Sequence, residues 1–156
     1  MLRSIGEFIS EITGGGRRQE SFEETDYRLA AAALLVHVIA SDDRILPAEC
    51  DRLRDVLAHR FQLGAEETAR LIESAMQADR EAVDLYQFTS VLNRSLDDAG
   101  RRHVVEMMFE VAYADGQLSE FEDNIVWRAA ELMHVPSRER VTMRSRLRDA
   151  AARKEN

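Results

Sequence analysis

Two stretches of this chain, which lie 73 residues apart, repeat one pattern. Residues 34–49 read LLVHVIASDDRILPAE, and residues 107–122 read MMFEVAYADGQLSEFE. In each stretch an apolar helical segment ends at a turn that begins with aspartate. One aliphatic residue follows, and a new helix then starts with glutamate in its first turn. The repeat predicts an internally duplicated fold made of helix–turn–helix units.

The rest of the chain extends the helical pattern in both directions. Alanine, leucine, glutamate and arginine are abundant, and only two prolines interrupt the 156 residues. No segment shows the sustained two-residue alternation that is typical of a β-strand. We therefore expect an all-α protein with about seven helices in its main part, over residues 22–40, 47–61, 65–77, 84–96, 99–114, 119–134 and 138–152.

A further short helix is expected at the N-terminus. Five apolar residues within 2–12 recur at helical spacing, and the triple glycine that follows at 14–16 predicts a hinge. We expect an amphipathic arm and hinge over 1–20, one helical domain over 21–153 and a frayed tail over 154–156. Two roles stay open for the arm: it packs onto the domain, or it contacts a membrane surface or a partner protein.

Composition narrows the class of protein. The net charge of -8 opposes binding along a phosphate backbone, so no nucleic-acid partner is expected. Cys50 is the single cysteine, which suits a reducing cytoplasm. Its place in a helix predicts a small core or half-buried residue, with a catalytic thiol as the weaker alternative. The longest apolar run, 29–40, is too short to span a bilayer, and no secretory signal precedes it.

Local chemistry explains much of the repeated motif. Ser119 and Glu122 have the spacing of a capping box, in which each side chain accepts a hydrogen bond from the other residue's backbone amide. Glu49 occupies the equivalent position of the first copy, where its charge favours a helix N-terminus. A glycine follows Asp115 and suits a turn that needs positive φ. The aliphatic residue of each turn, Ile45 or Leu118, is expected to insert into the core.

The pairing of the two motifs predicts a second role for the same acidic residues. If the two turns meet in the duplicated fold, five carboxylates gather there, and carboxylates that lie close together need a compensating cation. Oxygen ligands suit Ca²⁺, Mg²⁺ or Mn²⁺, although the loop lacks the ligand spacing of an EF-hand. The alternative is that these residues only cap helices. The candidate metal ligands are Asp42, Asp43, Glu49, Asp115 and Glu122.

Both copies of the motif resemble a known family signature. Residues 39–49, IASDDRILPAE, and residues 111–122, VAYADGQLSEFE, are similar to the A-x-A-D-G-x-I-x-x-x-E signature of TerB-like domains. The resemblance covers roughly residues 22–152 and implies a multihelical bundle with internal duplication. It also implies a role in metal-linked stress response, with the acidic motif residues as ligands. The first copy departs from the signature because Asp43 stands where glycine is usual.

Other residues give weaker evidence of function than the two acidic motifs do. His37 lies on an apolar stretch and is expected to be a hydrogen-bonded core residue, with a ligand role as the alternative. Residues 107–109, MMF, are expected in the core. The last helix forms a basic surface, expected to face solvent, with docking of an acidic partner or anionic lipid as the alternative. Its arginines are Arg138, Arg140, Arg144, Arg146, Arg148 and Arg153.

These observations favour a binding module over an enzyme. The sequence has no zinc-protease spacing, no phosphate-binding loop after a strand and no nucleophile elbow. We expect a cytoplasmic, non-enzymatic module that binds a divalent cation and acts in stress response through contacts with a protein partner. The alternative is a protein-interaction or membrane-peripheral helical domain whose acidic motifs are structural caps.

Overall fold

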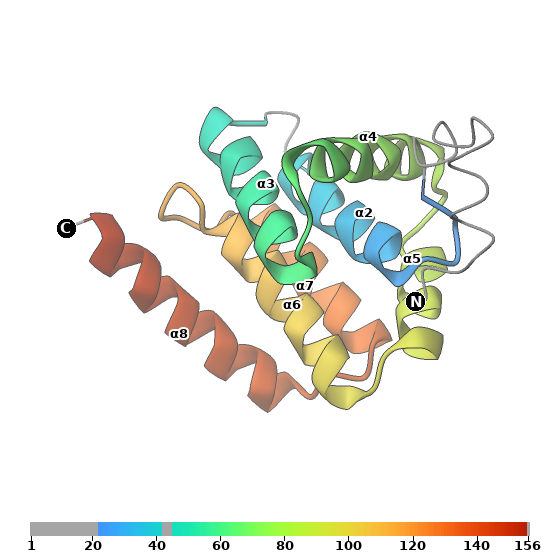
Figure 1. Ribbon diagram of the computed structural model, residues 1–156. Helices are drawn as coiled ribbons and strands as arrows, with labels where there is room; N and C mark the ends of the chain where they lie inside the picture. The colour runs from blue at the N-terminus through green and yellow to red at the C-terminus, as the bar shows by residue number, and fades with distance from the viewer. Residues whose placement is uncertain (1–21, 42–44, 156) are drawn as a thin grey trace, which may run out of the picture.

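The computed structural model describes residues 22–41 and 45–155, and these residues form seven α-helices and no strand. The predicted all-α class is therefore confirmed for this part of the chain. The expected N-terminal helix over 2–12 and the turn residues Asp42 and Asp43 lie outside the described residues. The helices are α2 (Tyr27–Ile39), α3 (Pro47–Phe61), α4 (Ala65–Glu81), α5 (Tyr86–Ser95), α6 (Asp98–Ala112), α7 (Glu120–Leu132) and α8 (Ser137–Glu155), as Figure 1 shows.

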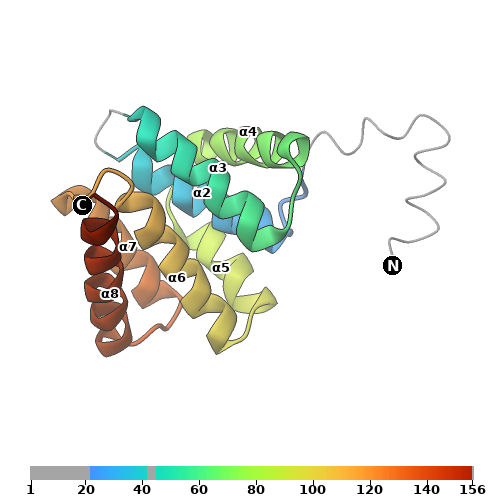
Figure 2. The ribbon, with the colours of Figure 1, turned by 60° about the vertical axis from the view of Figure 1, so that its left-hand side comes forward.

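Helix α2 is the core of the fold. Ten of its 13 residues are buried, and α3, α4, α5, α6 and α7 all pack against it (Figures 1 and 2). Four consecutive alanines, at 30–33, leave room for neighbouring helices to approach the backbone closely. A helix that is apolar around its whole circumference is stable only when other elements cover it, and these helices do so. The MMF stretch of α6 is also buried, as predicted.

Side-chain caps account for several differences from the expected helix bounds. Helix α2 begins at Tyr27 and not near residue 22, because Asp26 accepts a hydrogen bond from the Arg28 backbone amide at 2.8 Å. In the same way Asp97 caps α6 by accepting from the Gly100 amide at 2.9 Å. Helix α4 continues one turn beyond residue 77, and α8 continues to Glu155 through residues that were expected to fray.

Two turn predictions had different outcomes. Gly116, after the second aspartate, has φ of 88°, which confirms the need for glycine at this position. Helix α3 ends at Phe61, as predicted, through Gln62, whose φ is 55°, and Gly64 precedes α4. The prediction that Ile45 inserts into the core is wrong, because this side chain is 44% exposed. Leu118, its counterpart, is half-buried and packs against the core.

Helix α8 lies at the edge of the molecule. Both views place it beside α6 and α7 and away from α2 and α4 (Figures 1 and 2). Within the described ranges, no helix combines the length and the apolar character that crossing a membrane requires.

Candidate functional site: two paired glutamates

Glu49 lies at the third position of α3, and the structure holds it by the helix start. The backbone amide of Leu46 donates to Glu49 Oε1 at 3.0 Å. Leucine has no acceptor that could return this bond, so the cap is one-sided. Pro47 occupies the first position of the helix, where its missing amide hydrogen costs nothing. The Glu49 side chain is buried, with 3% exposed.

Glu122 occupies the equivalent position of α7, inside a complete capping box. The Ser119 amide donates to Glu122 Oε1 at 3.0 Å, and the Glu122 amide donates to Ser119 Oγ at 3.1 Å. The capping box predicted from the sequence is confirmed. Glu122 is also only 3% exposed, so the same packing buries the acidic residue of both motif copies.

The two glutamates meet between the starts of α3 and α7. Burial is the largest of the causes that raise the pKa of the Glu122 carboxyl to about 7. A hydrogen bond with Glu49 and the charge of Glu49 add to the rise, and the Ser119 cap opposes it. None of the groups that act most strongly on this pKa is basic. Two carboxyl groups in contact hold a proton or bind a cation, because both cannot be charged without compensation.

Of the three candidate ligands that the structure describes, it joins two, Glu49 and Glu122. Asp115 is exposed in the turn between α6 and α7, where its Oδ1 accepts from the Gln117 amide at 3.1 Å. Over residues 22–41 and 45–155, no group of three or more His, Cys, Asp or Glu side chains is placed to hold a metal ion. Asp42 and Asp43 lie outside this part of the chain, so their role stays a prediction.

His37 differs from the expected core histidine. Its side chain is 40% exposed, and its Nδ1 lies 2.7 Å from Asp79 Oδ1 of α4. The histidine therefore links two helices at the surface. Asp79 went unnoticed in the sequence because it lies 42 residues away, and no local motif connects the two positions.

The arginines of α8 contact the protein's own carboxylates. Arg144 lies 3.1 Å and Arg140 lies 4.0 Å from Asp123 of α7, and Arg146 pairs with Glu106 of α6. The expectation that the arginines face solvent is wrong for Arg140, whose side chain is 12% exposed. Arg144 and Arg146 keep 36% and 58% of their side chains exposed, and they also pair with carboxylates of α6 and α7. Nothing local in the sequence marks Asp123 or Glu106 as their partners.

Cys50 follows Glu49 in α3 and is half-buried and free, which confirms the expected packing position. No hydroxyl or thiol is described in hydrogen-bond contact with His37, whose described side-chain partner is Asp79.

Comparison with known proteins agrees with the family resemblance of the sequence. The family model described as "Tellurite resistance protein TerB" matches residues 28–145, from the first turn of α2 into α8. No curated protein and no solved structure matches the chain. The matched part includes both paired glutamates and all seven described helices, the last of them in part. Because this match covers well over half of the 156 residues, the chain belongs to the TerB family of tellurite resistance proteins.

Proposed function

We propose that this protein is a non-catalytic TerB-family module that binds a divalent cation through Glu49 and Glu122. The observation that carries the proposal is the contact of two buried carboxyl groups, with no basic group among the strongest influences on the pKa of Glu122. A cation between them replaces the proton and removes the repulsion between two charged carboxylates.

The arrangement of the oxygens favours a small, hard ion. The helix caps engage Oε1 of each glutamate, so Oε2 of each is the atom assigned to the ion. Mg²⁺ typically keeps several waters and takes one or two protein carboxylates, whereas Ca²⁺ takes six to eight oxygens. Two glutamates therefore suit Mg²⁺ or the chemically similar Mn²⁺ better than Ca²⁺. The proposal rests on Glu49 and Glu122, because Asp115 does not join the pair, and the roles of Asp42 and Asp43 stay predictions.

The cellular role follows from family membership and from the position of the pair. A cation held by both glutamates joins the start of α3 to the start of α7, and so joins the two motif copies. We propose that a protein partner in a cytoplasmic stress response recognises the joined form. Support for the stress response comes from the family description, tellurite resistance.

The test is a thermal melt of chelator-treated protein with Mg²⁺, Mn²⁺ or Ca²⁺ added separately. An ion at about 100 times its dissociation constant stabilises the folded state by about 2.7 kcal/mol. We expect an upward shift of Tm with Mg²⁺ or Mn²⁺ in the unaltered protein and none in Glu122→Gln. Electron paramagnetic resonance of Mn²⁺ measures binding directly, because binding depletes the signal of the free ion.

Glu120→Gln is the matched control. Glu120 begins the same helix but is exposed, so its replacement removes one charge and leaves the pair intact. The control protein is expected to keep the ion-dependent shift. No ion-dependent shift in any protein, together with an undepleted Mn²⁺ signal, would overturn the proposal.

That outcome would favour the alternative, a protein-interaction module with structural acidic caps. One observation supports it: each glutamate accepts the amide hydrogen bond of its own helix start, which accounts for its residue type without a metal. On this alternative the pair is a proton-sharing contact between two helix ends, and function lies on the surface.

A further inference from the structure

Helix α8 has little apolar attachment to the rest of the fold. It is the most polar helix described, and among its 19 residues only Met143 is a buried apolar side chain, with Leu147 and Ala151 half-buried. Helix α2, by comparison, buries ten of 13 residues. Burial of one side chain and parts of two others stabilises a helix of this length only weakly against detachment.

Ion pairs supply the other attachments of α8. Besides the contacts of Arg140 and Arg144 with Asp123 of α7, Arg102 of α6 lies 3.7 Å from Glu139 near the start of α8. Arg146 pairs with Glu106 in the middle of the helix. Most of these side chains are partly exposed, so each pair contributes little by itself and salt screens it.

The ion-paired part of α8 lies near Tyr113, directly before the turn of the second acidic motif. Tyr113 ends α6 directly before that turn and is only 7% exposed. Burial raises the pKa of the Tyr113 hydroxyl, and the charges of Arg144 and Arg148 oppose this rise, which places both arginines of α8 near the ring. Asp123, the main partner of the helix, immediately follows Glu122 in α7.

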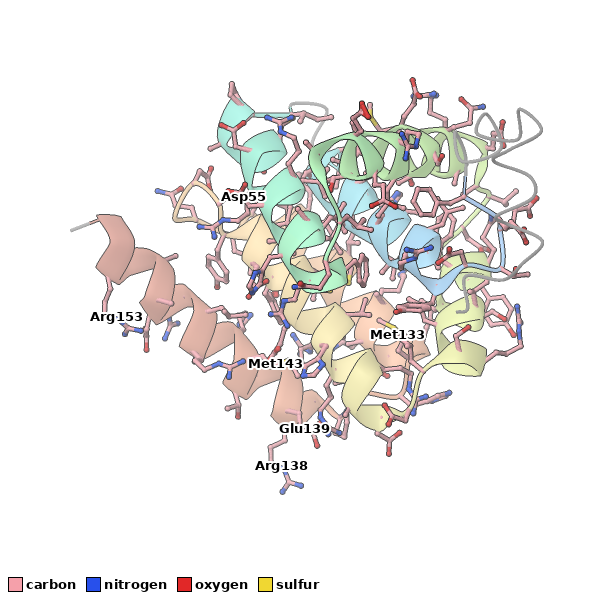
Figure 3. The ribbon with its side chains drawn as sticks, viewed as in Figure 1. Asp55, Met133, Arg138, Glu139, Met143 and Arg153 are labelled. Carbon is pink, nitrogen blue, oxygen red and sulfur yellow. The ribbon has the colours of Figure 1, made fainter. Side chains whose placement is uncertain are left out.

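We propose that α8 is a reversibly docked strap, held against α6 and α7 mainly by ion pairs. Its release uncovers Tyr113 and leaves Asp123 without its arginines, directly beside the second motif. Raised ionic strength releases the strap, and so does an acidic protein surface that competes for the arginines. Figure 3 shows Arg138 and Arg153 extending from α8 away from the other helices, where such a surface makes its first contact. The proposal does not depend on cation binding.

Hydrogen–deuterium exchange of the full chain, followed by mass spectrometry, tests the strap. We expect amides of α8 to exchange about tenfold faster in about 1 M NaCl than in about 0.05 M, because the screening length falls from more than 10 Å to about 3 Å. Amides of α2 serve as the reference for the core, and they are expected to exchange at the same rate at both salt concentrations. The proposal would be overturned if the amides of α8 were as protected as those of α2 and their exchange did not change with salt.

Charge reversal separates ion pairing from other effects of salt. Arg140→Glu with Arg144→Glu is expected to speed α8 exchange at low salt by about tenfold, the effect of losing several weak pairs. Adding Asp123→Arg restores opposite charges and is expected to restore protection. Arg138→Glu is the control, since Arg138 points outward from the same helix. Equal protection of α8 in the double variant, or no recovery with Asp123→Arg while α2 stays protected, would contradict the strap.

Discussion

The carboxyl group of Glu122 shows how burial changes the response of one residue to pH. Its pKa of about 7 lies above the ordinary value of 4.5, so between these values the folded protein holds a proton that the unfolded chain has lost. This group contributes stability that is fully present below about pH 4.5 and is lost as the pH rises through about 7. The loss is about 3 kcal/mol at most.

Glu122→Gln isolates that contribution. The amide oxygen of glutamine accepts from the Ser119 amide as the carboxyl does, and its nitrogen donates to Glu49 without a titrating proton. We predict that the variant gains stability relative to the unaltered protein as the pH rises from about 4.5 to about 8. Urea unfolding at a series of pH values, in chelator, measures the difference. Parallel pH curves for the two proteins would contradict the shared proton.

Residues differ in how far sequence alone predicts their roles. The Ser119–Glu122 box was predictable because both partners lie within one turn of helix. The contact between Glu49 and Glu122 depends on packing of distant segments, and the internal repeat provided the only sequence signal for it. His37 and Asp79 had no such signal, so the histidine was placed in the core incorrectly.

Single helices depend on their caps, and α7 gives a clear test. Ser119→Ala removes the acceptor for the Glu122 amide and is predicted to lower the free energy of unfolding by about 1 kcal/mol. Ser95→Ala is the control, because Ser95 is exposed at the last position of α5. Chemical denaturation of both variants measures the effect. Equal stability of the two variants would show that the cap contributes nothing to α7.

Helix existence was predictable, but helix ends were less so. Periodic apolar residues indicated all seven described helices, since each needs a buried stripe. Helix α3 ends at Phe61 as predicted, and Gln62, which is not a glycine, adopts the left-handed conformation directly after it. The end of α4 was misplaced because no strong breaker follows Gln77, and the helix continues to Glu81.

At the scale of the whole molecule, α2 and α8 have opposite polarity, and their positions were predictable to different degrees. The continuous apolar sequence of α2 indicated burial, and the structure packs five helices against it. The arginines of α8 indicated a solvated face, yet acidic groups of α6 and α7 face several of them. The sequence of a helix shows the polarity of that helix. Which charges lie opposite it depends on how distant segments pack together.

This contrast predicts unequal costs for equal truncations. Leu34 of α2 is fully buried, so Leu34→Ala removes packing on all sides and is expected to cost about 2–5 kcal/mol of unfolding free energy. Leu147 of α8 is only half-buried, and Leu147→Ala is expected to cost about 1 kcal/mol or less. Urea unfolding followed by circular dichroism compares the two variants. Equal losses would mean that α8 is as firmly packed as α2, which would argue against an ion-paired strap. A small loss confined to α8, detected as faster hydrogen exchange there alone, would support it.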